Sequence, residues 1–421
     1  MLKRKSVSIL LVMAVLALLI FSASASVLAQ DEDEEVTITV GTWADESFEA
    51  AVELFNEEYP NINVELQLAA IEDHHDNLLT RLAADGEVPD VAYLEDQYIS
   101  TLAARGGFED LSQEPYNGDQ HKDKLVEYPF AQATTQDGQL VAMPTDVAPG
   151  TIFYRHDRLE ELGVDIEDIK TFEDWIEVGK KFQESGEDRW LIGDVANIYT
   201  MMINGSSTDR YFDEDGELVI NSDRFLNAFE TAKEVREMGL DAEISEWTNE
   251  WFTVLNEGQV LMQPSGAWLG GHLREWIAPE TEGKWRVTSF PEGYDGPWGG
   301  SFAGIPKSSE NKEAAWKFIE FMATDRAVQW SNFRIADMFP TIEELYDHEA
   351  FEEEIDFYGG QKARLVWKET ILNIPAINTN QHDSFVMDMM GNALGEVLEG
   401  TQDPQQALNE TEMLIERRIS R

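Results

Sequence analysis

The alternation of strand-like and helix-like apolar patterns restricts the fold of this chain more than any other feature of the sequence. Residues 36–40 alternate apolar and polar side chains, as a half-buried strand does, and the pattern stops at Gly41. Apolar residues then recur at helical spacing over 48–59, and residues 62–68 alternate again. A second helical stretch leads to the apolar strand 91–94. Strands that alternate with helices predict a parallel sheet covered on both faces.

The same two patterns continue through the rest of the chain. Thr171, with Asp174 three residues later, predicts a capped helix start, and Asp403 followed by Pro404 predicts another. Further strands are predicted at 140–143, 151–154 and 260–262, and further helices at 172–182, 225–235, 315–322 and 404–419. The fold class is therefore α/β.

Two segments interrupt these patterns and predict crossings between two lobes. Pro144, Pro149 and Gly150 mark the first crossing, and the glycine-rich stretch 295–300 marks the second. We expect an N-terminal lobe and a C-terminal lobe, each an α/β unit. The predicted N-terminal lobe comprises 36–146 plus 300–333, and the predicted C-terminal lobe comprises 147–299 plus 334–421.

The first residues have the three parts of an export signal. Basic residues at 3–5 precede an apolar run at 9–21, and small residues lead to Ala29. A membrane anchor is the competing interpretation, but a spanning helix needs about 20 apolar residues, more than this run contains. We predict a signal peptide, 1–29, cleaved after Ala29, and an acidic linker, 30–35.

The chain has no cysteine. This excludes disulfides, thiolate metal sites, cysteine nucleophiles and a lipid-bearing cysteine. After cleavage we expect a soluble, exported protein in the periplasm or outside the cell, without a lipid anchor.

The formal net charge of −51 restricts the partners. Nucleic-acid binding is excluded, because it depends on Lys and Arg that neutralise phosphates. So many negative charges also repel one another in the folded state, and salt screens that repulsion. A saline habitat is one hypothesis for it, and it predicts a loss of stability at low salt.

Motifs for catalysis, metals and cofactors do not emerge. The stretch 300–303 lacks the spacing of a nucleophile elbow, and 213–216 lacks the acidic twelfth position of a calcium loop. His74 and His75 are adjacent, so on a helix they point in different directions. We predict no catalytic residues, no metal site and no cofactor.

Aromatic residues at predicted strand exits indicate a binding site. The chain has 12 Trp and 11 Tyr, and Trp43, Tyr93, Trp268 and Trp298 lie beside glycine or acidic residues. A sugar ring stacks its apolar face on such rings while its hydroxyls bond to carboxylates or amides. Packing in the core is an equally open interpretation for each single Trp.

These segments resemble the extracellular solute-binding proteins of sugar-type ABC importers, the family that includes maltose-binding protein, and the resemblance covers nearly all of the chain after the signal peptide. The residues that carry it are Ile38 to Tyr59, Pro89-Asp90-Val91, Asp137-Gly138-Gln139, Met143-Pro144, Phe153 to Asp157, Thr171 to Trp175, Asn256-Glu257-Gly258, Gly266-Ala267-Trp268, Gly299-Gly300, Ile305-Pro306-Lys307 and Ala315 to Phe318. The resemblance implies a type II periplasmic binding protein fold, with two α/β lobes joined by a hinge and a ligand cleft between them.

The resemblance also implies ligand contacts. Trp268 is similar to the sugar-stacking aromatic of the family, and polar contacts are expected after the third strand. Asn373-Ile374-Pro375 resembles a late ligand-facing segment, although the aromatic residue expected after it is missing. The predicted ligand-binding residues are Trp43, Tyr93, Glu95, Asp96, Gln97, Asp146, Trp268, Trp298 and Gly300.

The expected function is capture of a mono- or oligosaccharide and its delivery, as a monomer, to the permease subunits of an ABC transporter. One alternative is a binding protein for a polyamine or another non-sugar solute, which carboxylates also favour. Another is a secreted carbohydrate-active enzyme.

Overall fold

The two alternating segments near the start of the chain form neighbouring strands. β1 (Val36–Trp43) and β2 (Ile62–Ala69) pair in parallel from Val36 opposite Ile62 to Trp43 opposite Ala69. The computed structural model describes residues 35–43, 46–84, 86–135, 137–205 and 207–420. The predicted signal peptide, 1–29, and residues 30–34 of the predicted linker lie outside the described residues.

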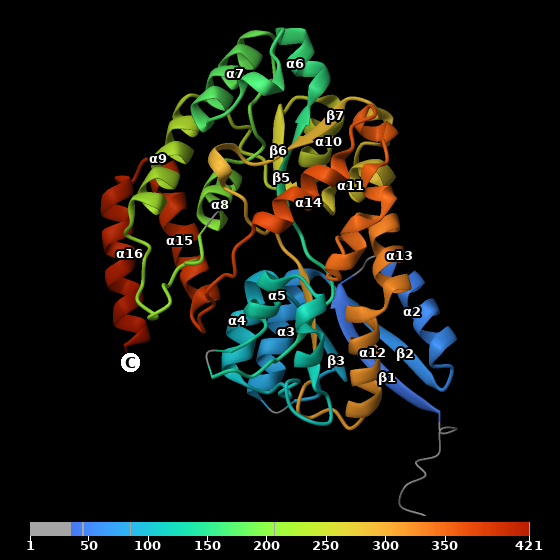
Figure 1. Ribbon diagram of the computed structural model, residues 1–421. Helices are drawn as coiled ribbons and strands as arrows, with labels where there is room; N and C mark the ends of the chain where they lie inside the picture. Colours follow the sequence, from blue (N-terminus) through green and yellow to red (C-terminus); the bar gives the residue numbers. More distant parts are fainter. Residues whose placement is uncertain (1–34, 44–45, 85, 136, 206, 421) are drawn as a thin grey trace, which may run out of the picture.

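The first lobe is built on a five-stranded sheet of order β2-β1-β3-β8-β4, in the lower half of Figure 1. Its other strands are β3 (Val91–Glu95), β4 (Met143–Pro144) and β8 (Ser301–Gly304). Its helices are α2 (Glu46–Glu58), α3 (Ile71–Ala83), α4 (Asp96–Arg105), α5 (Glu127–Gln132) and α12 (Lys312–Thr324).

The second lobe is built on a three-stranded sheet of order β6-β5-β7. Its strands are β5 (Gly150–Arg155), β6 (Met262–Gly266) and β7 (Trp285–Thr288). Its helices include α6 (His156–Leu162), α7 (Phe172–Glu184), α8 (Ala196–Asn204), α9 (Asp223–Glu237), α10 (Asn249–Glu257), α11 (Leu269–His272), α14 (Ala363–Asn373), α15 (Asp383–Leu398) and α16 (Pro404–Ile419). Helix α13 (Arg326–Ala336) follows α12 and contacts both α2 and α11.

The prediction of parallel sheets was wrong beyond β2-β1-β3. β8 runs antiparallel to both β3 and β4, and β5 runs antiparallel to both β6 and β7. β8 enters the first sheet after the chain has crossed to the second lobe and returned. Its direction is therefore set by a long-range path that local periodicity does not encode.

Two strand positions also differ from prediction. The strand predicted at 260–262 lies at β6, 262–266, and includes Pro264. β6 is an edge strand, where a proline that lacks an N–H is tolerated. The strand predicted at 140–143 is reduced to β4, whereas Leu140 makes an isolated bridge with Thr134.

Side chains of β5 alternate between two cores. Ile152 and Tyr154 pack in a cluster with apolar residues of α7, α9, α15 and α16, and Phe153 packs in another with Trp251 and Trp285. Both faces of this sheet are therefore buried. A third cluster fills the first lobe around β1, β3 and β8.

Candidate functional site

The end of β3 places two acidic residues beside the second crossing. The side chain of Glu95 caps α4 by accepting a hydrogen bond from the Gln97 backbone N–H at 3.0 Å. The backbone N–H of Asp96 donates to the Gly300 carbonyl at 3.1 Å. Local capping and the tertiary path thus act together to hold the polar end of β3 against residues that return from the second lobe.

Glu95 and Trp268, from the two lobes, meet at Gly299. A Cβ added to Gly299, whose φ is +91°, would lie 3.4 Å from Glu95 Oε1 and 3.6 Å from Trp268 Nε1. Trp268 Nε1 donates to the Trp298 carbonyl at 3.0 Å. The structure therefore brings a carboxyl group and an indole that are far apart in the sequence to the same glycine.

Trp268 belongs to a larger aromatic wall. Its ring stacks on Trp247 with centroids 5.8 Å apart and an angle of 23°. Gly266 allows the ring to lie close to the backbone, because a Cβ there would be 2.3 Å from Trp268 Nε1. Glu246, next to Trp247, accepts hydrogen bonds from Asn197 Nδ2 and Gln263 Nε2 at 2.7 and 2.6 Å. An acid and an aromatic ring thus lie side by side on the second lobe as well.

Glu95 on the first lobe and Glu246 on the second both have raised pKa values. Burial raises the pKa of Glu95 to about 8, and the neighbouring charge of Asp96 adds to the rise. Burial raises the pKa of Glu246 to about 7, although the bonds from Asn197 and Gln263 oppose it. Of the two, Glu95 is the one that stays mainly protonated at neutral pH, and a protonated carboxyl group both donates and accepts hydrogen bonds, which suits an uncharged hydroxylated ligand better than a cation.

Asp96 has protein partners from both lobes. Its Oδ1 accepts from Gln132 Nε2 at 2.5 Å, and its Oδ2 lies 3.3 Å from Arg210 Nη2. Arg210 belongs to the second lobe and is largely buried, so this ion pair joins the lobes. Beside it, burial raises the pKa of Asp383 to about 6, while Arg210 lowers it.

Helices α4 and α15 add hydrogen bonds between the lobes. Thr101 Oγ1 donates to Ser384 Oγ at 2.8 Å, and Ser384 Oγ donates to the Gln97 carbonyl at 2.9 Å. Gln97 therefore contributes to this contact through its backbone. Together with the Asp96–Arg210 pair, these bonds hold the two lobes against each other.

Trp43 ends β1 and Tyr93 lies within β3, and their side chains are neighbours. Their ring centroids are 6.3 Å apart, and Trp43 also contacts the ring of His75 at 5.6 Å. Tyr93 is only 1% exposed and packs on Phe48, so its burial is that of a core residue. Trp43 is partly exposed.

The two adjacent histidines, His74 and His75, support this edge of the sheet. His74 Nε2 bonds to the Tyr93 carbonyl at 2.8 Å. His75 Nε2 accepts from the Glu95 N–H at 3.0 Å, while its Nδ1 bonds to the Ile71 carbonyl at 2.7 Å. Within the described residues, no group of three or more His, Asp or Glu side chains is arranged to hold a metal ion.

Asp146, Trp298 and Gly300 lie along the two crossings. Asp146 is half-buried, and its carbonyl is 3.6 Å from the position that a Cβ on Gly300 would take. The ring of Trp298 packs edge-on against Phe290 at 5.8 Å, so the carbonyl of Trp298 is the part that reaches Trp268. Gly300 has a φ of +121°, which favours glycine.

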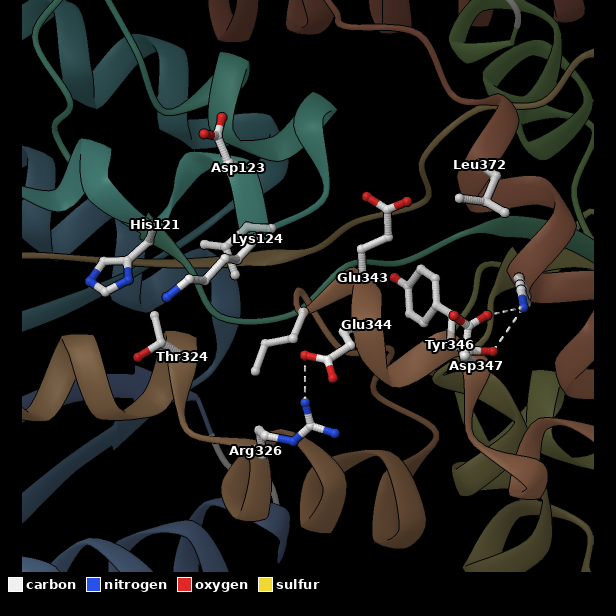
Figure 2. Close-up of a pocket in the computed structure, with 13 residues that line it drawn as sticks. His121, Asp123, Lys124, Thr324, Arg326, Glu343, Glu344, Tyr346, Asp347 and Leu372 are labelled. Atoms are coloured by element: carbon white, nitrogen blue, oxygen red, sulfur yellow. Dashed lines mark hydrogen bonds and ion pairs between the residues drawn. The ribbon is translucent and has the colours of Figure 1, made fainter.

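Two cavities open between the lobes, and none of the predicted site residues lines either of them. A cavity of about 720 Å³, shown in Figure 2, is lined by acids such as Glu343 and Asp347 and by cations such as Lys124 and Arg326. Arg326 Nη1 lies 2.8 Å from Glu344 Oε2. The other cavity, of about 400 Å³, lies between α4 and residues 379–381.

Sequence reasoning missed four residues of this region: Glu246, Trp247, Arg210 and Asp383. Glu246-Trp247 is an acidic residue beside a tryptophan, the same signal that was used elsewhere, but it precedes a helix instead of following a strand. Arg210 and Asp383 carry no local signal, because only the tertiary fold brings them to Asp96.

Comparison with known proteins places the chain in a family. The sequence profile of the bacterial extracellular solute-binding proteins matches residues 41–329. The chain is similar to an arabinooligosaccharide-binding protein of Halalkalibacterium halodurans, at 24% identity over 88% of this chain and 86% of that protein. It is also similar to a lactose-binding protein of Rhizobium radiobacter, at 26% identity over 87% and 91%.

Solved structures share the fold. The ABC transporter associated binding protein of B. animalis subsp. lactis Bl-04, in complex with β-1,6-galactobiose, has a TM-score of 0.78 at 23% identity, over 90% of this chain and 96% of that one. The galacto-N-biose/lacto-N-biose I-binding protein of Bifidobacterium longum has a TM-score of 0.76 at 18% identity, with the same two shares. The expected type II periplasmic binding protein fold is confirmed. With a family profile that matches more than half of its length, the chain belongs to the bacterial extracellular solute-binding protein family.

Proposed function

We propose that this protein binds a carbohydrate between its two lobes and delivers it to the permease of an ABC importer. The observation that carries the proposal is the meeting of Glu95 and Trp268 at Gly299. A sugar ring there would stack on the indole and exchange hydrogen bonds with a neutral carboxyl group. The names of the relatives, which include arabinooligosaccharide- and lactose-binding proteins, support the same ligand class.

We also propose how the protein is processed and where it acts. We propose cleavage after Ala29 and export to the periplasm or the cell exterior, without a lipid anchor, where the protein acts as a monomer. The extracellular family supports export. In the described part of the chain, no helix has the length and hydropathy to span a bilayer.

A thermal-shift screen of residues 30–421 tests the ligand class. The screen compares monosaccharides, oligosaccharides and polyamines in high salt. A ligand that binds only the folded state stabilises it by about 2.7 kcal/mol at a hundred times its Kd. A shift with a sugar series supports the proposal, and a shift with amines alone favours the polyamine alternative. New reducing ends after incubation with oligosaccharides would favour an enzyme.

The site itself is tested by Trp268→Ala. Loss of one stacking ring costs about 0.5–1.5 kcal/mol beyond the buried area, so we expect sugar affinity to fall about tenfold or more. Trp330→Ala is the matched control, because Trp330 packs on His348 at 4.2 Å, outside the residues of the site. Isothermal titration calorimetry measures both. Equal affinities for Trp268→Ala and wild type would place the sugar elsewhere.

A further inference from the structure

A strip of aromatic rings continues from Trp268 over the surface of the second lobe. Trp247 precedes α10, Phe252 lies on α10, His272 ends α11, and Trp276 lies on the π-helical turn η3 (Leu273–Ile277). We call these residues, together with Trp268, the aromatic strip. Trp247 and Trp276 are 47% and 51% exposed, although burial of so large an apolar surface is favourable.

The rings of the strip contact one another in sequence. Trp247 lies 5.8 Å from Trp268 and 5.5 Å from His272, measured between ring centroids. His272 lies 5.8 Å from Trp276, which lies 5.0 Å from Phe252. The strip is therefore continuous from Trp268, beside Gly299, to the exposed Trp276.

The exposed rings have specific local surroundings. Trp247 has a φ of +63°, a conformation that bulky residues rarely adopt. Trp276 Nε1 donates to His272 Nδ1 at 3.2 Å, while Leu273 and Ile277 anchor η3 in the core. π-Helical turns are frequent at functional sites. Rings that are already oriented lose less entropy when a ligand binds.

The chemistry of the strip suits sugars. Glu246, Glu250 and Glu275 flank its rings in the sequence, and Glu250 and Glu275 are exposed. Flat rings beside carboxylates match the apolar faces and the hydroxyls of linked sugar units. Anionic lipid surfaces attract basic segments, so these acids argue against a membrane partner.

We propose that the aromatic strip is an outer subsite, which binds the further units of an oligosaccharide whose inner unit lies between Glu95 and Trp268. This inference rests on the proposed carbohydrate-binding function. It narrows the ligand to chains of linked sugars that extend beyond the lobes, and it assigns Trp276 to the end of the subsite.

Calorimetric titration of wild type, Trp276→Ala and Trp276→Tyr with arabino- and malto-oligosaccharides, from disaccharide to hexasaccharide, tests the subsite. In wild type we expect affinity to rise with chain length. Trp276→Ala should bind the longest chains about 3- to 10-fold more weakly and disaccharides equally well, and Trp276→Tyr should restore most of the loss. Met413→Ala, at an exposed apolar residue of α16, is the control for surface truncation.

The outcomes separate the inference from the proposed function. Sugar binding that does not depend on chain length, or that Trp276→Ala weakens equally for all lengths, overturns the outer subsite and leaves the proposed function standing. Binding of no sugar, by wild type in this titration and in the wider screen, overturns both. The melting temperatures of all variants are measured as well. If the Trp276 variants melt at the same temperature as the Met413→Ala control, unfolding is excluded as the cause of lost affinity.

Discussion

Glu95 links the end of β3 to the meeting point with Trp268 at Gly299. Its N–H is held by His75 and its side chain caps α4, so the carboxyl group has a fixed place. Burial beside Asp96 raises its pKa to about 8, above the usual value of 4.5. The folded protein therefore keeps this proton where the unfolded chain has lost it. The resulting stabilisation is complete below about pH 4.5 and is lost as the pH rises through about 8.

Glu95→Gln tests this assignment. We expect the free energy of unfolding of wild type, relative to Glu95→Gln, to decrease between about pH 5 and about pH 9, because only wild type loses the proton-linked stabilisation. Urea unfolding at a series of pH values measures the difference. Glu65→Gln, at an exposed position of β2, is the control for loss of one acidic residue. A difference that stays level over this range would contradict a raised pKa.

A second prediction at the residue scale concerns the stability contributed by the Asp96–Arg210 ion pair. Arg210→Met leaves a buried carboxylate without its cation, and we expect a loss of about 3–5 kcal/mol in unfolding free energy. The double variant Arg210→Met/Asp96→Asn should recover part of it. Lys170→Met removes an exposed pair with Glu167 and should cost less than about 1 kcal/mol. A loss that small for Arg210→Met would indicate that the lobes separate in the free protein.

At the scale of single elements, helix starts are encoded locally. Thr171 and Asp174 were predicted to cap α7, and the structure confirms the full capping box. Asp403 was predicted to cap α16, and its side chain accepts from the backbone N–H groups of Gln405 and Gln406. Such caps need only residues within one turn, so the sequence alone reveals them.

Thr171→Ala should destabilise the protein by about 0.5–2 kcal/mol, because the backbone N–H of Asp174 loses its acceptor. Thr253→Ala, within α10, is the matched control, since its hydroxyl bonds only to the preceding turn at the Asn249 carbonyl. Thermal unfolding of the two variants measures the difference. Equal melting temperatures would show that the capping box contributes little to α7.

At the scale of the whole molecule, charge is the dominant feature. The net charge of −51 is spread over many exposed acids, and the folded state concentrates their repulsion. Salt screens such charges, with a Debye length of about 10 Å at 0.1 M and about 3 Å at 1 M.

We therefore expect the melting temperature to rise with sodium chloride and to level off towards about 1 M, as screening becomes complete. Differential scanning calorimetry at a series of salt concentrations measures the rise. A melting temperature that does not change with salt would remove the hypothesis of a saline habitat. A rise that stays linear to high salt would indicate exclusion of the salt from the surface instead.

The sequence by itself determined part of the elements and their order, whereas β7, β8, α14 and α15 were not among the predicted elements. Period-two alternation predicted β1 and β2, a short apolar run predicted β3, and helical spacing with caps predicted α7 and α16. These signals depend on residues a few positions apart, which is why they can be found without the fold. The resemblance carried by short motifs extended this to the family and to Trp268 and Glu95 as candidate ligand contacts.

Only the tertiary structure decided how distant residues meet. The direction of β8 depends on the return of the chain from the second lobe. Arg210 meets Asp96, and Trp268 and Glu95 both come to Gly299, because the two lobes pack against each other. Local patterns do not encode such contacts, because their free energy comes from burial and charge pairing that exist only once both lobes have formed.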